Sequence, residues 1–373
     1  MKKLAILFIF CLLNIAASCE KEGTGSKKLL SSNPLESSTD SLVDQHIRPF
    51  MEKRQHIGMS LAVIDGNKTS YYHYGEAIKG SGKLPNLESL YEIGSITKTF
   101  TAALALDYFQ QHTIDLSSAV NDFLPESVKE LAKNGVKMQL KHLLNHTSGL
   151  PRLPSDITKG WNPNNPYVHY TEDDIYANLA KIELSGEPGT KMEYSNLGFA
   201  LVGLILERHS GKSYEQLLTA HILKPVGLTK TKITLNAQEK SKMVAPYDPN
   251  GKEGSHWDLA NFKAAGALIA TIEDMATYAK VQMATYEGDK ATVFKQTKKS
   301  SFVLNEQTEV GMAWFLIKKG TKTLYFHNGG TGGFSSFIMI DPVQQKAVVS
   351  ISNNAFQTES ETASMALFGA FNP

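Results

Sequence analysis

The chain has 373 residues, of which 42% are hydrophobic and 20% are charged, a composition typical of a globular enzyme. Its 38 Lys and Arg residues nearly balance its 37 Asp and Glu residues. This balance argues against a strongly basic surface, and therefore against nucleic acid as a partner. The 11 His residues form neither an H-E-x-x-H motif nor a Cys/His cluster, so we expect no metal site.

Two lysines and an apolar run over residues 4–17 open the chain. The run is shorter than the about 18 to 20 residues that span a bilayer. We therefore predict a cleaved export signal over residues 1–18, with an uncleaved membrane anchor as the alternative. The small residues before Cys19 resemble the lipobox of bacterial lipoproteins, although Ala16 stands where Leu is usual. The resemblance implies an exported protein held on the bacterial cell envelope by lipid on Cys19; ordinary signal-peptidase cleavage near Ala17 is the alternative.

Cys11 and Cys19 are the only cysteines, so the body of the protein has no disulfide and no thiolate nucleophile. Residues 19–40 are polar and lack aromatic side chains. Such a composition cannot bury a core, and it predicts a flexible tether. Residues 41–373 are expected to form a single catalytic domain.

Strand patterns occur at both ends of this domain, and helical patterns fill the middle. Apolar alternation around a Gly66-Asn67 turn predicts the first strand pair. The predicted strands cover residues 59–65, 70–74, 312–318, 323–327, 336–341 and 346–351. The predicted helices cover residues 42–54, 97–111, 140–144, 172–182, 198–209, 214–222, 272–283 and 361–368.

Strands at both ends imply one sheet assembled from both termini, and its tight connections make it mainly antiparallel. We therefore predict an α+β fold with flanking helices and an inserted helical subdomain. The sheet layer is expected from residues 41–94 and about 262–373, and the helical subdomain from about 95–261.

Ser95 and Lys98 form an S-x-x-K pair where the predicted helix over 97–111 begins. Residues three apart share a helix face, so the Lys98 amine is expected over the Ser95 hydroxyl. A Ser hydroxyl needs a base to become a nucleophile, and Lys can act as that base when burial lowers its pKa from about 10.4. The pair alone is not specific, because Ser18 and Lys21 have the same spacing. An N-cap Ser beside a surface Lys is the alternative.

Tyr194 and Asn196 form a Y-x-N motif between a Pro-Gly turn and an apolar helix. A Tyr in this place can project its phenol into a cleft and relay a proton, and Asn196 can bind a substrate amide. The alternative is an aromatic side chain in a capping loop.

The segment H-N-G-G-T-G-G begins at His327, at the end of a predicted strand. Glycines let a backbone approach a ligand and direct N–H groups at it, as an oxyanion hole requires. His327 can orient a carboxylate or pass a proton. A glycine-rich hairpin connection is the alternative. No Walker A, Rossmann or G-x-S-x-G motif is present.

The ordered motifs at Ser95, Tyr194 and His327 resemble the serine β-lactamase and penicillin-binding DD-peptidase superfamily, in its class C-like branch. The joining segments match as well: L-K-H-L-L-N-H-T-S-G-L-P at 140–151, L-K-P-V-G-L at 223–228 and A-A-G-A-L at 264–268. The resemblance runs from about residue 37 to the chain end. It implies the β-lactamase/transpeptidase-like fold and no cofactor.

The resemblance also implies a mechanism, in which Ser95 attacks a carbonyl and forms an acyl-enzyme. Lys98 and Tyr194 would shuttle protons, and either could be the general base. The backbone N–H groups of Ser95 and Gly330 would form the oxyanion hole, and Asn196 would bind the acyl-side amide. The implied site residues are Ser95, Lys98, Tyr194, Asn196, His327, Gly329 and Gly330.

One departure bears on the substrate: His327 stands where β-lactamases keep the Lys that holds the antibiotic's carboxylate. A neutral imidazole binds a carboxylate less strongly than an ammonium does. We therefore expect a hydrolase of D-amino-acid peptides, of the D-alanyl-D-alanine carboxypeptidase or D-aminopeptidase type. The sequence leaves its oligomeric state open, with a monomer as the default expectation. An esterase or weak class C-like β-lactamase is the alternative, followed by a non-catalytic penicillin-binding sensor.

Two variable-looking segments, 154–170 with Trp161 and 247–257, are expected to form cleft walls and so to select the small-molecule or peptide substrate. A disordered surface loop is the alternative for each.

Overall fold

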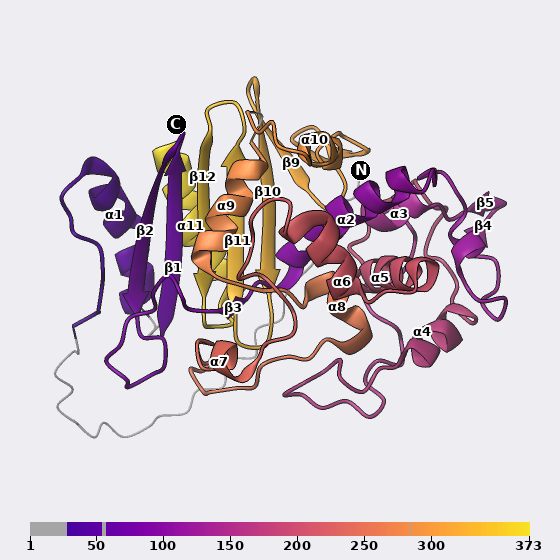
Figure 1. The fold of residues 1–373 in the computed structure, drawn as a ribbon, viewed down its shortest axis with the longest axis horizontal. Coiled ribbons are helices and arrows are strands. Elements are labelled where there is room, and N and C mark those ends of the chain that lie inside the picture. Colours follow the sequence, from indigo (N-terminus) through magenta and orange to yellow (C-terminus); the bar gives the residue numbers. More distant parts are fainter. Residues whose placement is uncertain (1–27, 54–56, 284) are drawn as a thin grey trace, which may run out of the picture.

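The computed structural model describes residues 28–53, 57–283 and 285–373. The expected signal peptide and Cys19 lie outside these residues. Within the described ranges, no helix combines the length and the apolar character that crossing a membrane requires. Figure 1 shows the sheet on one side of the molecule and most of the helices on the other.

An eight-stranded sheet joins the two ends of the chain, and every neighbouring pair in it is antiparallel. Its strands in spatial order are β2 (Lys68–Gly75), β1 (Gly58–Asp65), β12 (Lys346–Ser352), β11 (Ser335–Asp341), β10 (Lys322–Gly330), β9 (Phe315–Lys319), β8 (Thr308–Val310) and β7 (Phe302–Asn305). In the pairing of β1 with β12, Leu61 lies opposite Ser350. The predicted sheet built from both termini is confirmed.

Both faces of this sheet are covered by helices (Figure 1). Helices α1 (Ser38–Lys53) and α11 (Gln357–Phe371) pack on one face, and α9 (Ile272–Val281) packs against β1 and β12 on the other. Strand β1 contributes side chains to the hydrophobic cores on both faces of the sheet, because alternate side chains of a strand point to opposite faces. Leu61 and Val63 join the core beneath α1 and α11, whereas Ala62 and Ile64 join the larger core.

The helical region forms the rest of the larger core, around the buried helix α2. Its helices are α2 (Thr97–Gln111), α3 (Leu140–Leu144), α4 (Glu172–Leu179), α5 (Asn196–Ser210), α6 (Tyr214–Leu218), α7 (Ala237–Lys240), α8 (Lys263–Gly266) and α10 (Ala291–Thr297). Two small antiparallel pairs complete it: β3 (Tyr91–Glu92) with β6 (Ile269–Ala270), and β4 (Ala132–Lys133) with β5 (Val136–Lys137).

Several boundaries differ from the prediction. Strands β7 and β8 and helix α10 were not predicted, because segments of three to seven residues are too short to show a hydrophobic period. The strand expected over 323–327 continues to Gly330, where Gly329 and Gly330 pair with Ser336 and Ser335 of β11. The glycines are therefore part of the sheet and not a hairpin connection.

The last part of the expected tether is folded onto the sheet. Ser31 forms a β-bridge with Tyr74, and the Asn33 side chain donates to the Tyr74 hydroxyl (2.9 Å) and to the Asp40 carbonyl (2.8 Å). Asp40 is itself buried in α1 and accepts a hydrogen bond from the Tyr72 hydroxyl (2.7 Å). The polar composition of this segment gave no sign of these contacts. The predicted tether, which ran through residue 40, is therefore too long.

Candidate active site

Ser95 occupies the one partly open position in a long buried stretch. Every residue from Tyr91 to Phe109 is buried except Ser95. It lies in a 3₁₀ turn, Gly94–Ile96, that leads directly into α2. Its side chain does not cap the helix, which excludes the alternative of an N-cap Ser.

Lys98 is fully buried and lies beside Ser95, as the i, i+3 spacing predicts. Its Nζ is 3.1 Å from Ser95 Oγ and donates to the Ala265 carbonyl at 2.6 Å. Burial, with a smaller contribution from the Arg152 cation, holds the pKa of Lys98 well below its usual value. An amine with a lowered pKa can accept the proton of a nearby hydroxyl, which a surface Lys could not do at neutral pH.

Tyr194 faces Lys98 from the loop that precedes α5. The Lys98 Nζ lies 4.9 Å from the centroid of the Tyr194 ring. On the other side, the His146 ring stacks on Tyr194 with a centroid distance of 4.3 Å, and His146 Nδ1 accepts a hydrogen bond from the Ser195 N–H (3.1 Å). Burial raises the pKa of Tyr194 to about 12, so the phenol keeps its proton at neutral pH.

The glycines of β10 allow this strand to touch the Ser95 turn. A Cβ on Gly329 would lie 2.2 Å from the Ile93 carbonyl oxygen and 2.9 Å from the Ser95 nitrogen. On the facing backbone, Gly94 has a φ of +50°, and a Cβ there would lie 2.6 Å from the Gly330 nitrogen. The backbone nitrogens of Ser95 and Gly330 therefore lie at a contact between two main chains that no side chain could enter.

His327 is fully buried, so it lies behind the surface that a ligand can touch. Its Nδ1 hydrogen-bonds to the Asn328 carbonyl (2.6 Å), and since a carbonyl only accepts, Nδ1 carries the proton. Burial and the nearby Lys98 lower the pKa of His327 to about 3. A neutral, covered imidazole cannot contact a substrate carboxylate, so the prediction that His327 orients one directly does not hold. Its Nε2 is buried without a partner among the described residues.

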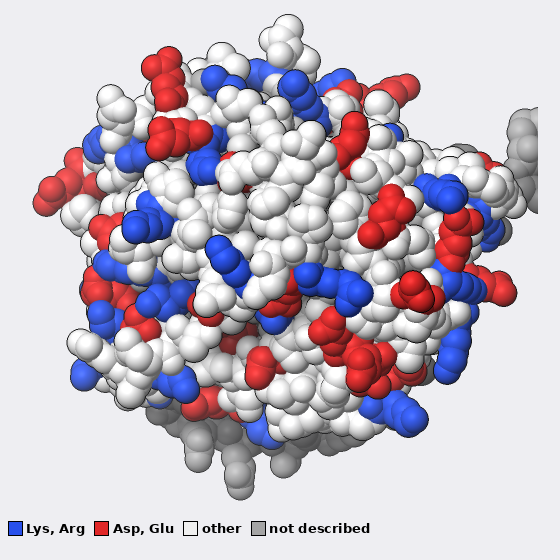
Figure 2. All heavy atoms as spheres, turned by 45° about the vertical axis from the view of Figure 1, so that its right-hand side comes forward, with Lys and Arg blue, Asp and Glu red and all other residues white. Residues whose placement is uncertain are grey.

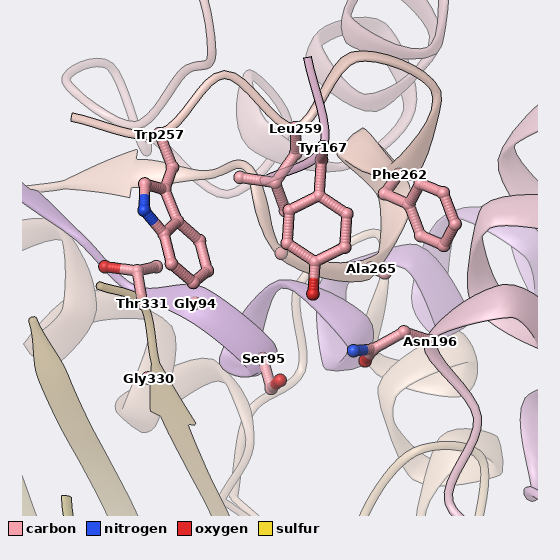
Figure 3. A pocket seen from close by; sticks show the side chains of 11 residues that line it. Gly94, Ser95, Tyr167, Asn196, Trp257, Leu259, Phe262, Ala265, Gly330 and Thr331 are labelled. Atoms are coloured by element: carbon pink, nitrogen blue, oxygen red, sulfur yellow. The ribbon is translucent and has the colours of Figure 1, made fainter. Parts of the chain in front are cut away.

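A small cavity opens on one side of Ser95 (Figure 3). Its volume is about 30 Å³, and Tyr167, Trp257 and Phe262 supply its aromatic walls. Asn196 also faces this cavity, and its buried Oδ1 has no partner among the described residues. An unpartnered amide oxygen beside the nucleophile can accept an N–H from a substrate.

A larger polar chamber of about 470 Å³ opens on the other side of Ser95. The lining residues are Ser95, Arg152, Tyr194, Phe315, Ile317, Phe326, Asn328, Gly330, Gln357, Thr358 and Glu361. Ser95 and Gly330 border both cavities. A substrate carbonyl group bound at these two residues would therefore lie where the small cavity meets the large chamber.

The predicted site residues thus come together, and the two expected wall segments contribute Tyr167 and Trp257 to the cleft. Trp161 instead lies about half exposed, away from both cavities. Sequence reasoning missed His146 and Arg152. Both lie in or directly after the matched segment 140–151, and that position is the only signal that could have singled them out.

The surface and the side-chain clusters bear on possible partners. On the face shown in Figure 2, basic and acidic side chains are interspersed, and neither sign forms a continuous band there. Across the part of the chain that the structure describes, no three His, Cys, Asp or Glu side chains gather as a metal site.

The site combines a nucleophilic Ser with a buried Lys one turn further on and a Tyr that faces both of these side chains. This combination defines a class of serine hydrolase. The chain belongs to the Beta-lactamase family, whose family model matches residues 43–368. It is therefore a serine hydrolase of the β-lactamase/DD-peptidase family.

Several characterised proteins are similar to it. The D-alanyl-D-alanine-carboxypeptidase/endopeptidase AmpH of Escherichia coli K12 is 27% identical over 300 residues, which cover 76% of each chain. The protein flp of Staphylococcus aureus MW2 is 27% identical over 83% of this chain and 62% of its own. Among solved structures, a beta-lactamase/D-alanine carboxypeptidase from Pseudomonas syringae has a TM-score of 0.78 at 18% identity, covering 90% of this chain and 100% of that one. The beta-lactamase/D-alanine carboxypeptidase from Yersinia pestis, complexed with citrate, has a TM-score of 0.75 at 24% identity. The match covers 90% of this chain and 99% of that one. The two structures establish the fold.

Gly329→Ala is expected to lower kcat/KM about 100-fold, because displacing reacting groups by about 1 Å has effects of that size. The added Cβ would collide with the Ile93 carbonyl and push β10 away from the Ser95 turn. Gly369→Ala in α11 is the control, since a Cβ there meets nothing within 4 Å. Steady-state kinetics on any turned-over ester test this, and a fully active Gly329→Ala enzyme would contradict the close contact.

The pH dependence of kcat/KM should follow Lys98. Its amine must be unprotonated to accept the Ser95 proton, so activity is lost as the pH falls through the lowered pKa of Lys98 and is recovered as the pH rises. Burial also lowers the pKa values of His146 and His327, so both imidazoles are neutral at neutral pH. A pH–rate profile measures the limb. A midpoint at the usual pKa of an exposed Lys would show that the amine is not perturbed.

Proposed function

We propose that the protein is a serine peptidase that removes the C-terminal residue from D-alanyl-D-alanine peptides by way of an acyl-enzyme on Ser95. The observation that carries the proposal is the placement of Ser95 Oγ 3.1 Å from Lys98 Nζ, at the border between a small cavity with aromatic walls and a large polar chamber. Similarity to a D-alanyl-D-alanine-carboxypeptidase/endopeptidase supports the substrate class.

In the acylation step, Lys98 Nζ takes the proton of the Ser95 hydroxyl while Oγ forms a bond to the scissile carbonyl carbon. The carbonyl oxygen becomes an oxyanion, which the N–H groups of Ser95 and Gly330 stabilise. Of the two candidate bases, Lys98 fits better, because its pKa is lowered whereas that of Tyr194 is raised to about 12.

Tyr194 then acts as the acid. Its hydroxyl donates a proton to the leaving nitrogen as the carbon–nitrogen bond breaks, and the Lys98 ammonium restores the Tyr194 proton. A water molecule attacks the Ser95 ester by the reverse sequence of proton transfers and releases the acid product. His146 positions Tyr194 through the stacking contact and the Ser195 hydrogen bond.

The small cavity favours a carboxypeptidase over a D-aminopeptidase. It borders Asn196, which the family resemblance assigns to the acyl side of the substrate. A volume of about 30 Å³ has room for about one or two waters, comparable to the methyl group of D-Ala. No charged side chain is among its described lining residues, so nothing there matches the free ammonium of an aminopeptidase substrate.

An esterase is the second candidate, and the buried neutral His327 favours it over a strong β-lactamase. An ester needs only the Ser95 machinery, whereas a β-lactam antibiotic brings a carboxylate that the ammonium at this position holds in β-lactamases.

The purified protein should release D-Ala from an N-acylated D-Ala-D-Ala peptide, and Ser95→Ala should abolish this release. Removing the nucleophile of a serine hydrolase lowers kcat about 10⁶-fold. Amino-acid analysis of the products measures the reaction, and Ser117→Ala, at a surface Ser, is the control. Cleavage of simple esters with D-Ala-D-Ala peptides left intact would overturn the proposal in favour of the esterase.

We also propose that the protein is exported and lipidated on Cys19, which the sequence pattern before that residue supports. Bacteria that express the full chain should incorporate radiolabelled palmitate into it, and Cys19→Ser should remove the label. Cys11→Ser is the matched control and should keep it. An unlabelled wild-type chain would contradict lipidation.

A further inference from the structure

Arg152 is a cation in the polar chamber that neither the family motifs nor the proposed chemistry uses. Among the described residues that line the two cavities, it is the only Lys or Arg. Its side chain is exposed and makes no ion pair with any residue in the described ranges. Its guanidinium carbon lies 5.0 Å from the centroid of the Tyr194 ring.

We infer that Arg152 binds the C-terminal carboxylate of the leaving D-amino acid. This inference deepens the proposed function and rests on it. A guanidinium matches a carboxylate with two parallel hydrogen bonds, which makes Arg the residue suited to such recognition. The described part of the chain offers the site no other free cation, because Lys98 is buried against Ser95 and His327 is neutral and covered.

The backbone holds Arg152 at the wall of the chamber. Its carbonyl accepts hydrogen bonds from the N–H groups of Asn196 (2.9 Å) and Leu197 (3.2 Å). Ser195, whose hydroxyl caps α5, donates that hydroxyl to the neighbouring Pro151 carbonyl at 2.7 Å. Arg152 is therefore anchored to the same helix start that carries Tyr194, the proposed acid for the leaving group.

The other charges of the chamber support this orientation. Glu361 of α11 also lines the chamber, where it accepts a hydrogen bond from the Asn328 side chain. A carboxylate is repelled by Glu361 and attracted by Arg152, so the two charges direct it to the Arg152 wall. The leaving nitrogen is then on the side of Tyr194, which lies beneath the guanidinium.

The test compares two substrates that differ only in the charge of the leaving group: an N-acylated D-Ala-D-Ala peptide as the free acid and as its C-terminal amide. Arg152→Gln should raise KM for the acid roughly ten- to hundredfold, the usual worth of a hydrogen bond to a charged group. It should change KM for the amide less than about threefold, and Arg152→Lys should recover part of the loss on the acid. Arg208→Gln, at an exposed Arg of α5 outside both cavities, is the control and should match the wild type.

Equal losses on both substrates, with the pH–rate limb moved to higher pH, would overturn the inference. That result would mean that Arg152 acts only by lowering the pKa of Lys98. If the wild-type enzyme turned over neither peptide, the proposed function itself would fail and this inference would fall with it. The two failures are distinct, because only the first occurs in an enzyme that cleaves the peptides.

Discussion

The amine of Lys98 is buried in an apolar interior, and the arrangement of the site depends on keeping it there. An isolated buried ammonium is strongly disfavoured, so such a group shifts its pKa unless it is fully paired. Here the only hydrogen-bond partners found among the described residues are the Ala265 carbonyl and Ser95 Oγ. A neutral amine satisfies both, donating one N–H to Ala265 and accepting the hydroxyl proton of Ser95. The environment that makes Lys98 a base is thus also the environment that disfavours its charged form in the resting enzyme.

The helices and the sheet supply this environment from distant parts of the sequence. Helix α8 presents its carbonyls to α2, where Thr101 and Lys98 donate to Ala264 and Ala265. From the sheet, β10 approaches the Ser95 turn so closely that only glycine fits at Gly329 and Gly94. The cleft therefore exists because the N-terminal strands and the C-terminal strands form one sheet, which brings residues more than two hundred positions apart into contact.

Much of this architecture could be predicted, because it rests on local spacing. The interval of three residues between Ser95 and Lys98 predicts that their side chains share a face. The long apolar stretch over α2 predicts that this helix is buried. The exposure of each site residue could not be predicted in the same way.

His327 is covered because it packs against Phe315 and Tyr194, which come from other elements. The stacking of His146 on Tyr194 and the free guanidinium of Arg152 likewise depend on long-range geometry, which no single segment encodes. The extension of β10 through Gly330 opposes strand propensity, and the close main-chain contact at Gly329 explains why glycine is nevertheless required.

The protonation state of Lys98 is the central claim, and nuclear magnetic resonance of protein containing isotope-labelled lysine measures it directly. The Cε signal of Lys98, assigned by its loss in Lys98→Arg, should titrate with a midpoint well below those of the exposed lysines. Titration together with the exposed lysines, near their usual pKa of about 10.4, would contradict the account, because a permanently protonated Lys98 could not take the proton from Ser95.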